Sequence, residues 1–406
     1  MTRLVIIGAG MAAGRLLEHL VAEAAPYEIT LFNAEPRGTY NRLMLSPVLA
    51  GETTYEKTVT HDDAWYAAHG ITARLGEPVT RIDRAARIVH GPRGPVPYDR
   101  LVIATGSTPF MIPLPGHDLP GVIPYRDLED TEQMMALSPG REAVVIGGGL
   151  LGLEAAAGMA ARGIRVTVVH LMDHLMERQL DAEAAALLKS SLEARGIRIL
   201  LGAHSEAIEG QGRVEALRLK DGRRIPCDLL CMAVGIRPAT QLASEAGLDV
   251  ARGIVVDDHL RTSDPSIFAL GECTEHRGAL FGLVAPLYDQ ARALADTLLG
   301  RPSAFVQKSL ATKLKVTGCD LFSAGDFAEA DGREDLLFHD RAGGTYKRLI
   351  LEGDRLVGAV IYGDTADGAW YFDLIQSGAD VSGLRDTLLF GPAHEPVPMP
   401  RCSLAA

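Results

Sequence analysis

The chain has 406 residues, of which 47% are hydrophobic, and a formal net charge of −12. This length predicts two or three domains of about 150 residues each, in an ordinary globular protein. The negative charge disfavours nonspecific binding to nucleic acid and adhesion to an anionic membrane. No apolar run reaches the ~18 residues that span a bilayer. The N-terminus enters a predicted strand without a basic segment, so no signal peptide is expected.

The cysteines predict a cytoplasmic protein without a metal site. Their number is odd and they are scattered, which suits a reducing compartment. The chain contains no CxxC pair and no four-cysteine run that could hold an iron–sulfur cluster. We therefore expect buried cysteines that act as small hydrophobes. They are Cys227, Cys231, Cys273, Cys319 and Cys402.

The first elements alternate between strand and helix. A strand at 3–8, a helix at 11–24 and a strand at 28–35 predict a βαβ unit and a parallel sheet. The segment YDRLVIATG, residues 98–106, reads as a buried strand that ends in a turn. The Pro-rich stretch 108–121 has no helical period and predicts a crossing linker.

A second βαβ unit starts at Ala143, continues through the strand before His170 and is closed by the segment 233–238. Residues 262–273 return to strand and turn, and a helix is expected from near Pro286. Alternating strands at 346–363 predict a hairpin around 352–354, and a helix follows at 370–378. The fold class is therefore α/β, with two Rossmann-like domains and a small C-terminal α+β domain. The expected domain ranges are 1–112, 113–241, 242–303 and 304–406.

Two glycine turns between a strand and a helix predict two dinucleotide cradles. In such a turn the first glycine permits the bend, the second lets a pyrophosphate approach the backbone, and the third small residue packs the helix on the strand. The phosphates then lie at the positive end of the helix. The first cradle consists of Gly8, Gly10 and Ala13, with Gly14 beside it, and the second of Gly147, Gly149 and Gly152.

The residues that follow each second strand bear on which nucleotide is bound. Glu35 stands about where a carboxylate meets the ribose hydroxyls. In the second cradle the corresponding residue is His170, and no positive charge follows before Arg178. NADH is therefore favoured over NADPH, which stays open. The alternative for His170 is a partly exposed histidine at a strand end, with no role in nucleotide binding.

The two cradles, together with YDRLVIATGS and TSDPSIFALGE, resemble the pyridine nucleotide–disulfide oxidoreductase superfamily, of glutathione-reductase-like fold. The resemblance implies FAD in the first cradle, formed by 1–112 and the return segment 242–303, and NAD(P)H in the second, formed by 113–241. The segments 39–51, 171–181, 253–273, 275–291 and 362–392 are similar to the FAD/NAD(P)H portion of assimilatory NAD(P)H nitrite reductases. Electron-transfer subunits of assimilatory nitrate reductases belong to the same group. Because this sequence stops before the cysteine-rich and sirohaem parts of nitrite reductases, we expect a reductase module alone.

The resemblance assigns further residues to FAD. Glu272 stands where the superfamily has an Asp that meets the ribityl chain, and Thr105 and Gly106 match the turn after a strand. Arg42 and Ser46 match positions that approach the flavin in ferredoxin reductases, whose lysine is replaced here by Pro47. The helix near Pro286, with Val284 at its mouth, would stabilise the charge on the reduced flavin. The alternative is a packed surface helix.

For NAD(P)H, the resemblance places Glu154 near the nicotinamide and Gly235 and Arg237 at a turn beside it. The alternative for Glu154 is a solvated residue in the first helical turn, which the helix dipole favours. No catalytic residue is certain, because the flavin itself does the chemistry at N5.

The electron acceptor is expected to be a separate protein. No cysteine precedes Cys227, so the cysteine acceptors of disulfide- and peroxide-reducing relatives have no counterpart. The resemblance favours the catalytic subunit of an assimilatory nitrate or nitrite reductase as the partner. A rubredoxin or ferredoxin partner is the alternative. A non-catalytic redox sensor that binds dinucleotides is a third reading, which the intact Glu35 and Glu272 disfavour.

Overall fold

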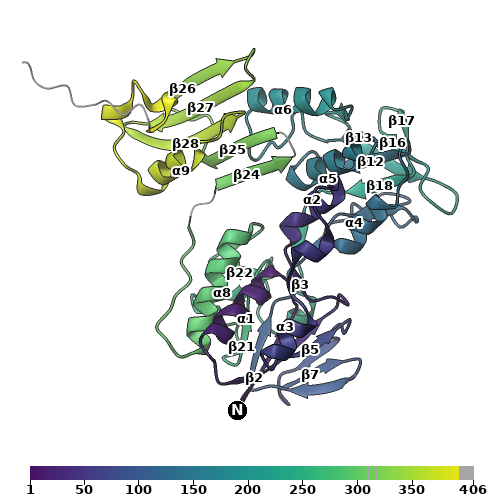
Figure 1. Ribbon diagram of the computed structural model, residues 1–406, viewed down its shortest axis with the longest axis vertical. Coiled ribbons are helices and arrows are strands. Elements are labelled where there is room, and N and C mark those ends of the chain that lie inside the picture. Colours follow the sequence, from purple (N-terminus) through teal and green to yellow (C-terminus); the bar gives the residue numbers. More distant parts are fainter. Residues whose placement is uncertain (309–310, 317–318, 393–406) are drawn as a thin grey trace, which may run out of the picture. The chain divides into compact units, whose positions relative to one another are not determined.

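The structure, a computed structural model, describes residues 1–308, 311–316 and 319–392 (Figure 1). The chain forms two compact units. Unit 1 comprises residues 1–110, 126–132 and 235–308, and unit 2 comprises 111–125, 133–234 and the part from 309 onward. Each unit contains one five-stranded parallel sheet, so the two expected Rossmann-like folds are confirmed.

The central sheet of unit 1 has the order β21-β9-β1-β2-β5. Its strands read as continuous apolar runs, because residues such as Leu4, Ile6 and Leu31 are fully buried in the core. Helix α1 buries Leu16 and Leu17 in the same core. The bounds are β1 (Thr2–Ile7), α1 (Met11–Ala22), β2 (Tyr27–Asn33), β5 (Thr72–Leu75), β9 (Arg100–Ile103) and β21 (Ile267–Ala269).

Smaller elements complete unit 1. Helix α8 begins at Val284, which puts Pro286 in its first turn as expected. The helical elements are η1 (Arg42–Met44), α2 (Leu45–Ala50), η2 (Tyr55–Thr58), α3 (Asp63–Ala68), α7 (Gln241–Glu245) and α8 (Val284–Leu298). The strands are β3 (Thr39–Tyr40), β4 (Val59–His61), β6 (Arg81–Asp83), β7 (Ile88–Gly91), β8 (Gly94–Pro97), β10 (Ser107–Pro109), β19 (Ile236–Pro238), β20 (Ile254–Val256), β22 (Thr274–His276) and β23 (Ala279–Leu280).

The parallel sheet of unit 2 has the order β11-β18-β12-β13-β14. Its strands are β11 (Val122–Pro124), β12 (Glu142–Ile146), β13 (Arg165–Val169), β14 (Arg198–Leu200) and β18 (Leu229–Met232). Between β14 and β18 the chain forms a three-stranded antiparallel sheet of β15 (Ser205–Glu209), β16 (Ala216–Leu219) and β17 (Arg224–Pro226). The helices are α4 (Leu128–Met135), of which the first five residues belong to unit 1, α5 (Leu150–Ala161) and α6 (Ala182–Ala194).

The C-terminal part of unit 2 is a five-stranded antiparallel sheet with a core of its own. The expected hairpin is present as β27 and β28, and the expected helix is α9. The bounds are β24 (Ala311–Val316), β25 (Cys319–Gly325), β26 (Arg333–Asp340), β27 (Thr345–Glu352), β28 (Arg355–Tyr362), α9 (Gly368–Ser377), η3 (Ser382–Leu384) and η4 (Leu388–Phe390). Among the residues that the structure describes, no helix combines the length and apolarity needed to cross a bilayer.

Two segments of the expected domain 113–241 lie in unit 1. Residues 126–132 belong to unit 1, where Arg126 contacts Glu272. Residues 235–241 include β19. The second placement has a backbone cause, because β19 pairs antiparallel with β10, matching Pro238 with Ser107.

Within unit 2, Asp181 connects the C-terminal sheet to helix α6. Its carboxylate accepts from the Ala184 amide at 3.0 Å and so caps the helix. The same side chain accepts from the Tyr346 hydroxyl at 2.7 Å and from Arg348 at 3.3 Å. Asp181 and Arg348 are 14% and 11% exposed, so this ion pair is largely shielded from water.

We therefore expect Asp181→Ala to destabilise the protein more than the loss of a helix cap alone. A cap contributes about 1 kcal/mol, and the buried Tyr346 hydroxyl, left without its acceptor, costs about 1–3 kcal/mol more. Arg348 keeps its ion pair with Asp335 and so adds less. Asp62→Ala is the matched control, because Asp62 caps α3 through the Trp65 amide at 2.8 Å and its side chain makes no other hydrogen bond within the described part of the chain. Thermal unfolding of both variants gives the comparison, and equal losses would contradict the triple role of Asp181.

Candidate functional site

The first cradle lies between β1 and α1. Gly8 adopts φ +106°, and a Cβ there would lie 2.2 Å from the carbonyl oxygen of Ala104, the residue after β9. The Gly8 amide donates to the Phe32 carbonyl at 2.7 Å. Any side chain at position 8 would therefore push the turn off the sheet. Ala13 is fully buried, as the third small residue of the cradle should be.

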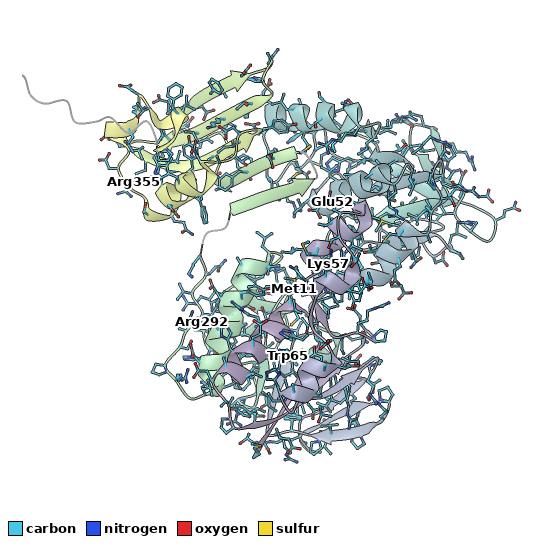
Figure 2. All side chains as sticks on the ribbon, viewed as in Figure 1. Met11, Glu52, Lys57, Trp65, Arg292 and Arg355 are labelled. Carbon is cyan, nitrogen blue, oxygen red and sulfur yellow. The ribbon has the colours of Figure 1, made fainter. Side chains whose placement is uncertain are left out.

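Gly10 leaves the start of α1 open. It caps the helix without a side-chain hydrogen bond, and the first turn contains no acidic residue. A Cβ on Gly10 would meet no atom within 4 Å, so the space in front of the helix is free. Met11, labelled in Figure 2, begins the helix directly after it. The unpaired amides of this turn fit the phosphates of a dinucleotide.

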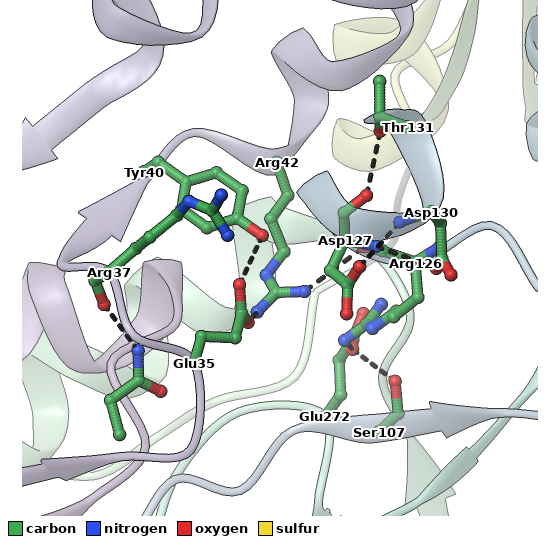
Figure 3. A network of polar contacts seen from close by, with 11 residues as sticks. Glu35, Arg37, Tyr40, Arg42, Ser107, Arg126, Asp127, Asp130, Thr131 and Glu272 are labelled. Carbon is green, nitrogen blue, oxygen red and sulfur yellow. Dashed lines mark hydrogen bonds and ion pairs between the residues drawn. The ribbon is translucent and has the colours of Figure 1, made fainter. Parts of the chain in front are cut away.

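Gly14 brings a ribbon of strands against the same helix. Its Cβ would lie 2.7 Å from the Thr39 methyl carbon and 3.1 Å from the ring of His61, on β3 and β4. The ribbon leads to Glu35, Tyr40 and Arg42, which form one polar cluster (Figure 3). Gly14 is thus a packing requirement for the residues around the cradle.

Glu35 is bound on two sides. Its carboxylate accepts from the Tyr40 hydroxyl at 2.8 Å and forms an ion pair with Arg42. Burial, with the Glu35 charge adding to it and Arg42 opposing, raises the pKa of Tyr40 well above its usual value, so the hydroxyl stays a donor. A carboxylate has about four acceptor sites, so Glu35 retains capacity for ribose hydroxyls. That role stays a prediction.

Glu272 lies in a second cluster, with a partner that the sequence analysis missed. Its carboxylate accepts from the Ser107 hydroxyl at 2.6 Å and from Arg126 at 2.5 Å, and its side chain is 14% exposed. Arg42 donates to the Arg126 carbonyl at 3.2 Å, which links this cluster to Glu35 (Figure 3). Arg126 stands in no glycine or proline motif, so local sequence gave no signal for it.

Other expected FAD residues lie near these clusters in unit 1. The Thr105 hydroxyl donates to the Ala239 carbonyl at 2.7 Å, and Gly106 accepts from the Ala239 amide at 2.9 Å. Ser46 lies on α2, partly exposed. The turn before Glu272 is held by Gln290, which is fully buried on α8 and accepts from the Gly271 amide at 2.8 Å. Sequence spacing did not single out Gln290.

The start of α8 has the features expected for a negative ligand group. Its first turn contains no acidic residue, and Leu283 caps it without a side-chain hydrogen bond. Val284 is partly exposed, whereas Pro286 is buried. The free amides can therefore receive a partial negative charge. Whether a flavin lies there stays a prediction.

Gly235 and Arg237 lie in unit 1, although they were expected beside NAD(P)H. The Gly235 carbonyl accepts from the Phe110 amide at 2.9 Å, and the Arg237 guanidinium lies 4.0 Å above the Phe110 ring. Both residues are exposed. Their contact with a nicotinamide nucleotide stays a prediction, as does that of Glu154, which is partly exposed on α5.

The second cradle, in unit 2, repeats the geometry of the first. Gly147 adopts φ +122°, and its Cβ would lie 2.2 Å from the Ala233 carbonyl oxygen, after β18. A Cβ on Gly152 would lie 2.2 Å from the Gly147 carbonyl oxygen. Gly149 caps α5 without a side-chain bond, and its Cβ would meet nothing within 4 Å. This helix start also fits a dinucleotide pyrophosphate.

His170 does not lie at the surface of this cradle. The residue is 7% exposed, so the alternative of a partly exposed histidine is wrong. Its Nδ1 accepts from the Gly148 amide at 3.0 Å, and its Nε2 lies 3.2 Å from Glu177. The ring therefore contacts the cradle loop itself rather than solvent.

The cysteines of the described residues are buried and free of disulfides. Cys273, directly after Glu272, is enclosed, and its thiol lies 3.2 Å from the Leu270 carbonyl oxygen. Burial raises the pKa of Cys273 and also that of Cys227, the latter to about 12. Thiols in this state are poor nucleophiles. Cys402 lies outside the described residues.

The turn that carries Arg126 contains a carboxyl group with a raised pKa. Asp130 is 7% exposed and accepts from the Arg126 amide at 2.7 Å, while Asp127 accepts from the Asp130 amide at 3.1 Å. This reciprocal capping fixes the backbone from which Arg126 reaches Glu272. Burial, with the neighbouring charge of Asp127 adding to it, raises the pKa of Asp130 to about 6.

We expect the stability that Asp130 contributes to fall between pH 4 and pH 7. The folded chain holds this proton more tightly than the unfolded chain, so the contribution is complete below the unfolded pKa of about 4 and is lost as pH rises through about 6. Asn does not titrate. The melting temperature of Asp130→Asn relative to the unchanged protein should therefore rise from pH 5 to pH 7. Glu129→Gln, on the exposed side of the same turn, controls for the lost charge. A constant difference across this range would contradict the raised pKa.

The chain was compared with known families and proteins. A family described as pyridine nucleotide-disulphide oxidoreductase matches residues 2–293, and the rubredoxin NAD+ reductase C-terminal domain matches 311–379. A nitrite reductase [NAD(P)H] of Bacillus subtilis (strain 168) is 46% identical over 94% of this chain and 48% of its own length. The assimilatory nitrate reductase electron transfer subunit of the same organism is 38% identical over 98% of this chain and 52% of its own. The chain thus spans about half the length of these relatives.

Two solved reductase structures are similar to this chain over nearly its whole length. The covalent putidaredoxin reductase–putidaredoxin complex matches with 28% identity and a TM-score of 0.84, over 93% of this chain and 94% of the other. The ferredoxin reductase for the CYP199A2 system of Rhodopseudomonas palustris matches with 28% identity and a TM-score of 0.83, over 94% and 98%. This chain therefore belongs to the pyridine nucleotide-disulphide oxidoreductase family, which confirms the expected class, an FAD-dependent NAD(P)H oxidoreductase.

Proposed function

We propose that this chain oxidises NADH and passes the electrons through FAD to a separate redox protein, the catalytic subunit of an assimilatory nitrate or nitrite reductase. The observation that carries the proposal is the presence of two open cradles with no accessible cysteine, among the residues that the structure describes, to receive electrons. The cysteines in the described residues are all buried. The 38% identity to a nitrate reductase electron transfer subunit supports the choice of partner. A cytoplasmic location is part of this proposal, and the lack of disulfides among the described cysteines supports it.

The residues that would hold each cofactor follow from the site. In unit 1, the amides after Gly10 would bind the FAD pyrophosphate, with Glu35 toward the ribose and Glu272 toward the ribityl chain. In unit 2, the amides after Gly149 would bind the pyrophosphate of NADH. FAD, when bound, supplies hydride acceptance and the release of single electrons. The ion pairs of Arg42 and Arg126 keep the two acidic side chains oriented before any ligand arrives.

A rubredoxin or ferredoxin partner is the second candidate. The C-terminal match is to a domain of rubredoxin NAD+ reductases. The ferredoxin–NAD(+) reductase component of a biphenyl dioxygenase system from Paraburkholderia xenovorans (strain LB400) is 38% identical over 66% of this chain. An assay of the purified chain with each class of acceptor separates the candidates. A non-catalytic sensor is the third reading, and rapid bleaching of the yellow protein by NADH would reject it.

The assignment of the cradles predicts two different defects. Gly10→Arg should yield folded protein without FAD, because the side chain fills only the space in front of α1. Gly149→Arg should keep FAD and its yellow colour but no longer bleach with NADH. Absorbance spectra of the two purified variants, before and after NADH, give the answer. Loss of FAD from Gly149→Arg with retention in Gly10→Arg would reverse the assignment.

Coupled turnover should need the partner and should weaken with salt. The net charge of −12 would attract a basic surface on the partner, and added salt screens that attraction. Alone, the chain should reduce dyes with NADH but neither nitrate nor nitrite. Nitrite formed from nitrate, NADH, this chain and the catalytic subunit is the measurement, repeated at rising ionic strength. Reduction of nitrate by this chain alone would refute the proposed role, and turnover only with rubredoxin or ferredoxin would favour the second candidate.

A further inference from the structure

The second cradle lacks an acid at the place where Rossmann folds hold the adenosine ribose. Strand β13 ends at Val169, and the next residue is His170. A ribose hydroxyl cannot bind this ring, because the ring is buried and both nitrogens already face protein atoms. The residue at the position expected for the ribose ligand therefore binds protein atoms instead.

The hydrogen bonds fix the protonation of the ring. Because the Gly148 amide is a donor, the Nδ1 atom of His170 accepts at 3.0 Å and carries no proton. The neutral ring then holds its proton on Nε2, which faces a carboxylate oxygen of Glu177 at 3.2 Å. The order is backbone amide, imidazole, carboxylate. Glu177 thus lies one hydrogen bond away from the residue at the strand end.

Packing keeps this arrangement in place. A Cβ on Gly148 would lie 2.7 Å from the His170 ring and 2.7 Å from Leu175, so only glycine leaves room for both. The Met176 amide, next to Glu177, donates to the Gly148 carbonyl at 3.0 Å. Gly148 in the cradle loop therefore makes two hydrogen bonds to the strand end and the segment that follows it. Its amide donates to His170, and its carbonyl accepts from Met176.

Glu177 retains the means to bind a ligand. Its side chain is 28% exposed, and its second oxygen has no hydrogen-bond partner among the described residues. Asp173, the other carboxylate of this segment, is 89% exposed and pairs with His174 at 2.6 Å. Arg178 is exposed and is the nearest cation along the chain. A 2′-phosphate, with a charge of about −1.5 to −2, would be repelled by Glu177.

We propose that Glu177 binds the adenosine ribose hydroxyls of NADH and rejects NADPH, and that His170 is the positioning residue that holds it there. The proposal rests on the proposed function, in which the second cradle binds NADH. It deepens that function by naming the residue that selects the nucleotide. In most Rossmann folds one acidic residue at the strand end binds the ribose. Here His170 occupies the strand end, and Glu177 supplies the carboxylate.

The test uses the FAD-loaded protein and two ligands that cannot react, ADP-ribose and 2′-phospho-ADP-ribose. Calorimetric titration gives the ratio of their affinities. The unchanged protein should prefer ADP-ribose. Glu177→Gln should reduce this preference about tenfold, the size of one hydrogen bond to a charged group, and Glu177→Arg should reverse it. Asp173→Asn is the matched control and should leave the ratio unchanged.

Variants of His170 separate positioning from mere packing. The amide of His170→Gln can still donate to Glu177, whereas His170→Asn preserves only the acceptor for Gly148. We therefore expect the first variant to keep more of the selectivity than the second. Adding Glu177→Gln to His170→Asn should lower the selectivity no further, because the two residues act as one unit.

The outcomes are distinct. An unchanged ratio in Glu177→Gln, or an altered one in Asp173→Asn, would overturn the role of Glu177 while leaving the proposed function intact. A preference of the unchanged protein for 2′-phospho-ADP-ribose would overturn the role of Glu177 and would also replace NADH by NADPH in the proposed function, with Arg178 as the residue to examine next. Failure of both ligands to bind the unchanged protein would overturn the proposed function and this inference with it.

Discussion

Both parallel sheets depend on a contact that leaves no room for a side chain. In each, the first glycine of the cradle lies against the carbonyl of the residue that follows the neighbouring strand, Ala104 in unit 1 and Ala233 in unit 2. The contact sets where the turn ends and the helix begins. The next glycine therefore presents the open end of the helix to free space. Two segments with little else in common in sequence thus produce the same anion-binding geometry.

The acidic residues around the first cradle are held by arginines instead of being left to solvent. Glu35 pairs with Arg42 and Glu272 with Arg126, and the Arg126 carbonyl connects the pairs. Largely buried ion pairs contribute little net stability, because desolvation offsets the attraction. Their value here is orientation: each carboxylate is fixed before a ligand binds, which lowers the entropy lost on binding.

Local sequence was sufficient where the chemistry itself is local. A strand, three small residues and a helix define each cradle, so the turn geometry at Gly8, Gly10 and their counterparts could be predicted from spacing alone. Long-range partners could not. Arg126 and Gln290 reach the turn at Glu272 from segments 146 and 19 residues away, where no motif marks them. Likewise, the sequence showed that an acid is missing at His170 but not where the ring points.

Asp181 also bears on how this chain can be recombined with its relatives. The Asp181 carboxylate caps the start of helix α6 in the Rossmann part and accepts hydrogen bonds from Tyr346 and Arg348 of the C-terminal sheet. A chimaera joined near residue 310 would import the two donors from one parent and the acceptor from the other. Such a hybrid would keep its stability only when both parents carry the same three side chains. The Rossmann part of unit 2 and the C-terminal sheet are thus linked by buried hydrogen bonds, although the C-terminal sheet has a core of its own.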